Sequence, residues 1–124
     1  MQNFAAKLVL GLRKFDHISE GRRSLKWLNV SEKLLFNDLV LAFKCVNKLA
    51  PEYLCKYFVK RSAVYGRTTR RSETLDIPRC RLSTGQRAFS YRGVNEWNKL
   101  GKDLQCCKDI NTFKRGLFKK IFSR

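Results

Sequence analysis

The sequence predicts a small, mainly α-helical domain with a long central helix, a basic loop, a short β-hairpin and a C-terminal amphipathic helix. Two stretches, 31–48 and 110–122, carry apolar residues at helical spacing. Hydrophobic residues make up 44% of the 124 residues, enough for one core, and the chain is too short for two comfortable domains. We divide this single domain into a helical part (1–59), a basic loop (60–74) and a hairpin with the C-terminal helices (75–124).

The first part of the chain should be helical. Residues 2–12 show helical spacing, and 19–27 predict a second short helix with Ser19 as its N-cap. The strongest pattern covers 31–48, where only a narrow polar strip interrupts the apolar positions, so this helix should be central and packed on several sides. Pro51 suits the first position of a further helical turn.

The middle of the chain loses the helical pattern. Residues 60–74 are polar, basic and rich in turn formers, which predicts an exposed loop. Residues 75–77 alternate like a strand, and 87–91 could pair with them as the second strand of a hairpin across a turn at 83–86. A short helix carrying a tryptophan should follow at 94–100.

The last helix is amphipathic, and Asp109 or Asn111 can cap it. Such a basic amphipathic helix also resembles one that lies on a membrane surface or binds a partner. Because a small domain needs apolar area, we expect the apolar face to complete the core. The apolar face consists of Ile110, Phe113, Leu117, Phe118, Ile121 and Phe122, and the cationic face of Lys114, Arg115, Lys119 and Lys120.

Positive charge is the clearest functional signal. Twenty-seven Lys and Arg against ten Asp and Glu leave a net charge of +17, which favours a polyanionic partner, nucleic acid first and an anionic membrane surface second. Residues 60–92 hold nine basic and two acidic side chains, or +7. Arginine forks bind phosphate through two hydrogen bonds, although a solvated loop that keeps the protein soluble is the alternative. The predicted nucleic-acid-binding residues are Lys60, Arg61, Arg67, Arg70, Arg71, Arg79, Arg81, Arg87 and Arg92.

Aromatic side chains are interleaved among these cations, and aromatic faces can stack on unpaired bases. They include Tyr65, Phe89 and Tyr91. We expect Phe89 and Trp97 to anchor the core instead of stacking on bases.

No pattern in the sequence points to catalysis or to a bound cofactor. His17 is the single histidine, and the carboxylates are scattered. Neither of the glycine-rich phosphate-binding motifs, G-x-x-x-x-G-K and G-x-G-x-x-G, occurs. We therefore expect no enzyme, no metal site and no cofactor. The five cysteines are odd in number, without C-x-x-C spacing. With no visible secretory signal, they indicate reduced thiols in the nucleus or cytoplasm, not secretion. No apolar run approaches the ~20 residues that span a bilayer, so integral membrane association is not expected.

Six strings in series resemble the region that follows the polymerase core in non-LTR retrotransposon reverse transcriptases of the jockey and chicken-repeat kind. They are "RKFDHIS" at 13–19, "LKWLNV" at 25–30, "AFKCVNKLAPEYL" at 42–54, "RSETLDIPRCR" at 71–81, "GQRAFSYRGVNEWNKL" at 85–100 and "FKRGLFKKIF" at 113–122. Asn29 and Gly101 stand where that family usually has proline. The resemblance covers nearly the whole chain, but the Ala-Asp-Asp polymerase motif is absent, so no catalytic residue carries over.

The resemblance implies a C-terminal piece or a domesticated remnant of a retrotransposon polyprotein. In that family the segment lies beside the thumb, where template RNA and target DNA pass. The leading hypothesis is therefore a non-catalytic segment that contacts RNA or DNA largely independently of sequence. The alternative is an interaction module, with incidental charge, that docks on an upstream polymerase core or another protein through helices 2–12, 31–48 and 110–122. A third hypothesis is peripheral membrane binding through the last helix.

Overall fold

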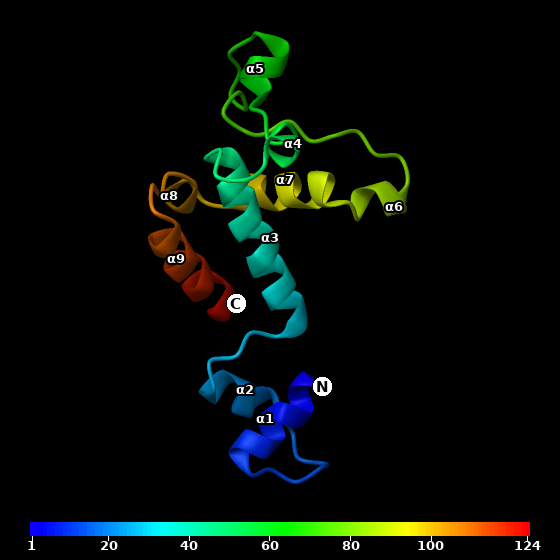
Figure 1. Ribbon diagram of the computed structural model, residues 1–124, viewed down its shortest axis with the longest axis vertical. Coiled ribbons are helices and arrows are strands. Elements are labelled where there is room, and N and C mark those ends of the chain that lie inside the picture. Colours follow the sequence, from blue (N-terminus) through cyan, green and yellow to red (C-terminus); the bar gives the residue numbers. More distant parts are fainter.

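The computed structural model describes residues 1–124 and contains nine helices and almost no β-structure, which confirms the mainly α prediction. Helix α3 runs through the centre, α7 crosses it, α9 lies alongside it, and α1 and α2 sit beyond its N-terminal end (Figure 1). The helices are α1 (Gln2–Leu10), α2 (Ser19–Ser24), α3 (Val30–Val46), α4 (Glu52–Cys55), α5 (Arg61–Tyr65), α6 (Ser83–Gln86), α7 (Phe89–Lys99), α8 (Lys102–Gln105) and α9 (Ile110–Phe122).

The central helix is defined at its start by a capping box. The Asn29 side chain accepts a hydrogen bond from the backbone N–H of Val30 at 2.7 Å, and the Glu32 carboxylate accepts one from the backbone N–H of Asn29 at 2.7 Å. These bonds satisfy amide groups that would otherwise lack partners at a helix N-terminus. The helix thus begins at Val30, one residue before the predicted start. It ends at Val46, shortly before Lys48 turns the chain with a φ of 57°.

The core forms where α3, α7 and α9 meet. Phe43 of α3 and Phe113 of α9 are stacked with ring centroids 4.5 Å apart, and Trp97 of α7 lies 5.9 Å from Phe113. On α9, the buried residues Phe113, Leu117 and Ile121 recur every four residues. The apolar face of the last helix therefore completes the core, as the sequence predicts.

The predicted β-hairpin is wrong. Residues 83–86 form α6, and 89–91 are the first residues of α7 instead of a strand. Gly93, Val94 and Trp97 are the buried residues of α7, so its apolar periodicity is helical and reaches further toward the N-terminus than the predicted 94–100. The alternation that suggested the hairpin covers only 75–77, which is too short to specify a partner strand. The packing of the α7 apolar face against α3 favours the helix over the strand.

Smaller differences occur elsewhere. Part of the predicted loop 60–74 is helical, because α5 occupies its first residues. The second helix begins at Ser19, so its N-cap is Ile18 and not Ser19, and it ends three residues earlier than predicted. Pro51 is the N-cap of α4 rather than its first helical residue. Asp109 caps α9 by accepting a hydrogen bond from the backbone N–H of Thr112.

Candidate nucleic-acid interface

The basic loop is closed at its base by backbone pairing. Residues 59–62 run antiparallel to 72–76, with a single β-bridge between Lys60 and Leu75. The N–H of Arg61 donates to the carbonyl of Thr74 at 2.9 Å, and the N–H of Asp76 donates to the carbonyl of Val59 at 2.8 Å. Residue 75 thus does pair, but with a segment before the loop instead of with 87–91. The pairing holds the two ends of the loop together.

Asn98 of α7 fastens this base to the core. Its side-chain oxygen accepts a hydrogen bond from the N–H of Leu75 and its amide donates to the carbonyl of Leu75, both at 2.9 Å. One side chain therefore satisfies both backbone groups of a residue that is only 3% exposed. Because buried backbone groups are costly when left unpaired, this contact fixes the loop against α7.

Removing this contact should destabilise the domain. We expect Asn98→Ala to lower the free energy of unfolding by about 2–3 kcal/mol, since it leaves a buried donor and a buried acceptor without partners. Urea unfolding followed by far-UV circular dichroism measures the change. Asn95→Ala, one turn earlier on the same helix, is the matched control, because no side-chain hydrogen bond of Asn95 is present. Equal losses in the two variants would contradict this role.

Three of the nine predicted cations are engaged in ion pairs. Lys60 Nζ lies 2.7 Å from Glu73 Oε2, and the pKa of Glu73 is lowered by the hydrogen bond and the charge of Lys60. Arg92 donates two hydrogen bonds, of 2.6 and 3.1 Å, to the carboxylate of Asp38 on α3. Arg61 Nε lies 3.9 Å from Asp76 and has no hydrogen-bond partner. Their charges are largely compensated within the fold.

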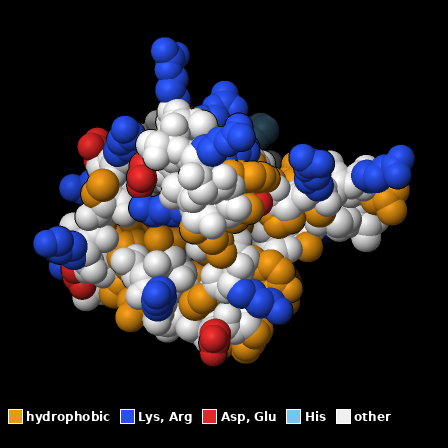
Figure 2. Space-filling model, turned by 90° about the horizontal axis from the view of Figure 1, so that it is seen from above, with side chains coloured by type: hydrophobic (Ala, Val, Ile, Leu, Met, Phe, Trp, Pro, Cys, Tyr) orange, Lys and Arg blue, Asp and Glu red, His pale blue; other side chains and the backbone are white.

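The other six cations remain exposed and form no ion pair. They occupy the loop after α5, the segment leading to α6 and the turn that follows α6. Viewed from the α5 end, Lys and Arg side chains are scattered over the face and along a projecting arm, with few acidic groups (Figure 2). These six, which we call the free arginines, are Arg67, Arg70, Arg71, Arg79, Arg81 and Arg87.

The aromatic residues near the free arginines have different environments. Phe89 is half-buried and packs against Phe58 with ring centroids 5.6 Å apart, and Trp97 is buried, so both anchor the core as predicted. Tyr91 is half-buried. Tyr65 at the end of α5 is 59% exposed and donates a hydrogen bond to Asp76 at 3.4 Å. Tyr65 is therefore the ring best placed to meet an unpaired base.

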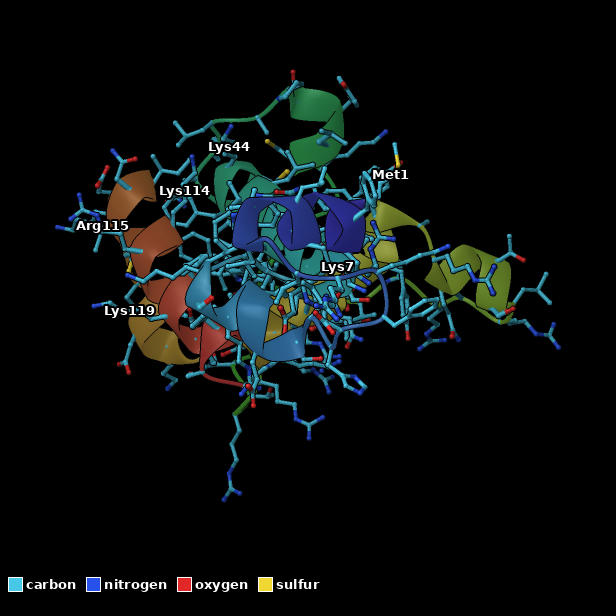
Figure 3. All side chains as sticks on the ribbon, turned by 90° about the horizontal axis from the view of Figure 1, so that it is seen from below. Met1, Lys7, Lys44, Lys114, Arg115 and Lys119 are labelled. Atoms are coloured by element: carbon cyan, nitrogen blue, oxygen red, sulfur yellow. The ribbon has the colours of Figure 1, made fainter.

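A second set of unpaired cations lies on α3 and α9. Seen from below, Lys44 of α3 appears on the same side of the molecule as Lys114, Arg115 and Lys119 of α9 (Figure 3). None of these four forms an ion pair. The sequence shows the cationic face of 110–122 but does not show that Lys44 joins it. The polar strip along 31–48, which includes Lys44, was the sequence feature that could have indicated this position.

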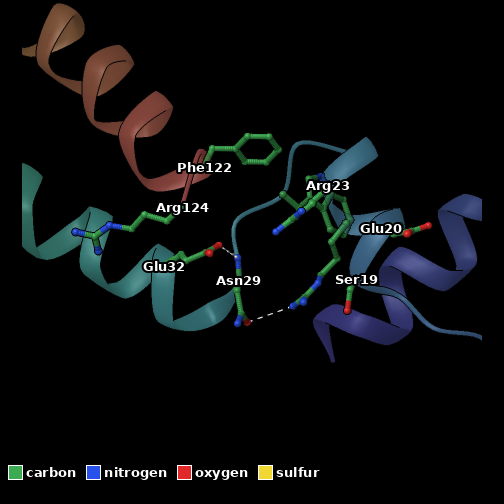
Figure 4. A pocket seen from close by; sticks show the side chains of 9 residues that line it. Ser19, Glu20, Arg23, Asn29, Glu32, Phe122 and Arg124 are labelled. Atoms are coloured by element: carbon green, nitrogen blue, oxygen red, sulfur yellow. Dashed lines mark hydrogen bonds between the residues drawn. The ribbon is translucent and has the colours of Figure 1, made fainter.

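A polar pocket of about 270 Å³ lies where α2, the start of α3 and the end of α9 meet (Figure 4). Its charges are mixed, because cations from α2 and the C-terminus face the carboxylates of Glu20 and Glu32. Glu32 is already engaged with the backbone of Asn29, and Arg22 donates to the Asn29 side chain at 3.2 Å. The polar groups of this pocket therefore cap the start of α3 and do not form an anion-binding site.

The cysteines are all free thiols, and the structure contains no group of three or more His, Cys, Asp or Glu side chains that could hold a metal ion. Burial, followed by the proximity of Cys55, raises the pKa of the Cys45 thiol to about 11. Cys45 therefore stays protonated at neutral pH and behaves as a small apolar core residue. None of the helices has the length and apolarity required to cross a membrane.

The fold and the surface together define a small helical protein with an exposed arginine-rich loop. Comparison with protein-family models, curated proteins and solved structures found no match for this chain.

Proposed function

We propose that this protein is a non-catalytic nucleic-acid-binding module that contacts RNA or DNA through the free arginines. The observation that carries the proposal is that six arginines of one segment are exposed and unpaired in a chain of net charge +17. Solubility of a small domain requires a net charge of only about 2–8, and +17 is well above that range. Six guanidinium groups without partners instead present a surface for phosphate.

The fold suits this role because it restrains the loop without covering it. Pairing of 59–62 with 72–76 and the Asn98 contact hold both ends of 63–71 on the core. Restraint lowers the conformational entropy that binding would otherwise cost. Tyr65 adds one exposed ring for stacking.

We further propose that the protein descends from the post-polymerase region of a non-LTR retrotransposon reverse transcriptase. The six strings quoted above support this origin, and the cationic surface is consistent with a segment that lies beside template RNA and target DNA. The proposal includes no catalytic residue, metal or cofactor in this chain. Free thiols support placement in the nucleus or cytoplasm.

Salt dependence of binding tests the proposed function. Titration of the full chain with fluorescent single-stranded RNA and DNA oligonucleotides of mixed sequence should give complexes at low salt. The plot of log K against log salt concentration should have a slope of about −4 to −5 if all six free arginines contact phosphates. Affinity should vary little between unrelated sequences of equal length.

The absence of any complex at low ionic strength would overturn the proposal. So would binding with a slope near zero, because phosphate contacts by cations necessarily release counterions.

A further inference from the structure

Helix α1 has an apolar face that the rest of the protein leaves uncovered. Its other side packs on α2, where Gly21 allows close approach: a Cβ atom there would lie 2.5 Å from Leu10 Cδ1. Phe4 and Leu8, one turn apart on the free side, are 67% and 68% exposed, and Leu12 follows the end of the helix and reaches toward Gly21 of α2. Ala6 is the one buried residue of α1, and no residue of α1 belongs to the main hydrophobic cluster.

This free side is concave. Phe4, Leu8 and Leu12, together with Asn3, Lys7 and Lys14, line a groove of about 410 Å³. The Lys7 ammonium donates a hydrogen bond to the carbonyl of Lys14, so the chain after α1 is held against the helix and forms one wall. A groove of this kind accepts protruding side chains better than it accepts a flat lipid surface.

The charge around the groove indicates the chemistry of its occupant. Residues 1–15 contain Lys7, Arg13 and Lys14 and no Asp or Glu. A second copy of this chain would bring like charges together across the groove, against a background of +17 per molecule. Carboxylates that flank an apolar stripe would instead pair with these cations.

The exposed area is large enough for a partner. The chain exposes 9578 Å², whereas a compact monomer of its mass exposes about 6,900 Å². The excess is about 2,700 Å², and a standard interface uses about 800 Å² of each partner. Exposed apolar side chains also occur on α3, α4 and α5, but α1 carries three that are more than 60% exposed, Phe4, Leu8 and Val9.

We propose that the α1 groove binds an acidic amphipathic helix of another polypeptide, with its apolar stripe on Phe4, Leu8 and Leu12 and its carboxylates beside Lys7 and Lys14. This inference does not depend on nucleic-acid binding, because the free arginines and α1 lie at opposite ends of α3 (Figure 1).

A designed peptide tests the proposal on the full chain. The probe is a fluorescein-labelled helical peptide of about 18 residues, or five turns, with leucines at i, i+3, i+4 and i+7 spacing flanked by glutamates. Fluorescence anisotropy should show saturable binding, and Leu8→Glu should weaken it by about 10-fold or more. Leu34→Glu on α3 is the matched control, since Leu34 is 60% exposed, and it should change affinity less than about twofold. Hydrogen exchange should slow over residues 2–12 in the complex.

Two control peptides separate the contributions of shape and charge. A peptide with serine in place of each leucine, or with lysine in place of each glutamate, should bind at least about 10-fold more weakly. Equal binding of either control, or equal effects of Leu8→Glu and Leu34→Glu, overturns the proposal. Circular dichroism of each variant verifies that the fold is retained.

Two further measurements address the other possible occupants. Sedimentation equilibrium should show a monomer, and co-sedimentation with phosphatidylcholine–phosphatidylserine vesicles should not depend on Leu8. A dimer that Leu8→Glu dissociates, or vesicle binding that it abolishes, would assign the groove to a second copy or to a membrane and would overturn the proposal.

Discussion

Replacing Phe113 with alanine is expected to lower the free energy of unfolding by about 3–5 kcal/mol. Phe113 is 0% exposed and lies between Phe43 and Trp97, so it joins α9 to both other core helices. The loss combines the transfer of a phenyl group with a cavity at the point where the three helices meet. Small domains have total stabilities of about 5–15 kcal/mol, so this substitution should remove much of it. Urea unfolding followed by far-UV circular dichroism gives the value.

Phe15→Ala is the control for this experiment. It makes the same chemical change at a side chain that is 89% exposed, and its expected effect is below about 0.5 kcal/mol. A loss of less than about 1 kcal/mol for Phe113→Ala would show that the aromatic cluster does not stabilise the fold as the structure indicates.

The triple substitution of Arg67, Arg70 and Arg71 by glutamine should weaken oligonucleotide binding on the order of 100-fold at low salt. Each phosphate contact contributes about 0.7–0.9 to the salt slope, so the slope should become shallower by about 2–3. These three side chains are exposed and form no ion pair, so their loss should leave the stability of the fold unchanged within about 0.5 kcal/mol. Binding isotherms over a range of salt concentrations measure both quantities.

Substituting Arg13, Lys26 and Lys33 by glutamine supplies the matched control. Both triple variants reduce the net charge from +17 by three, to +14. All three control residues are exposed, form no ion pair and belong to the N-terminal half of the chain. If net charge alone drives binding, the two variants will behave alike, and the assignment to the loop will be wrong. A loss confined to the first variant supports direct contact by these arginines.

The sequence predicted the helices whose signals are local. The helix expected at 31–48 is observed at Val30–Val46, and the helix expected at 110–122 matches Ile110–Phe122. Apolar spacing marks both, and a polar cap also marks the second; these signals depend only on residues a few positions apart. The N-cap at Asn29 was missed, although Glu32 three residues later completes the capping box that would have indicated it.

The hairpin prediction gave residue 75 the wrong partner, because the observed partner, Lys60, and the predicted segment 87–91 lie at similar distances from it along the chain. Leu75 is a bridge residue, but it pairs with Lys60 across the loop and with the Asn98 side chain. Three alternating residues cannot specify which of several segments they pair with. The choice follows from where α7 places Asn98 once the core has formed.

Composition and apolar spacing are enough to establish that the protein is mainly helical, that it carries +17, and that cations concentrate in 60–92. The sequence alone could not determine which of those cations are available to a partner. Arg92 is bound by Asp38, 54 positions away, and Lys60 by Glu73, 13 positions away, whereas Arg67, Arg70 and Arg71 have no carboxylate within reach. Ion pairing depends on distance in space, which only the packed helices set.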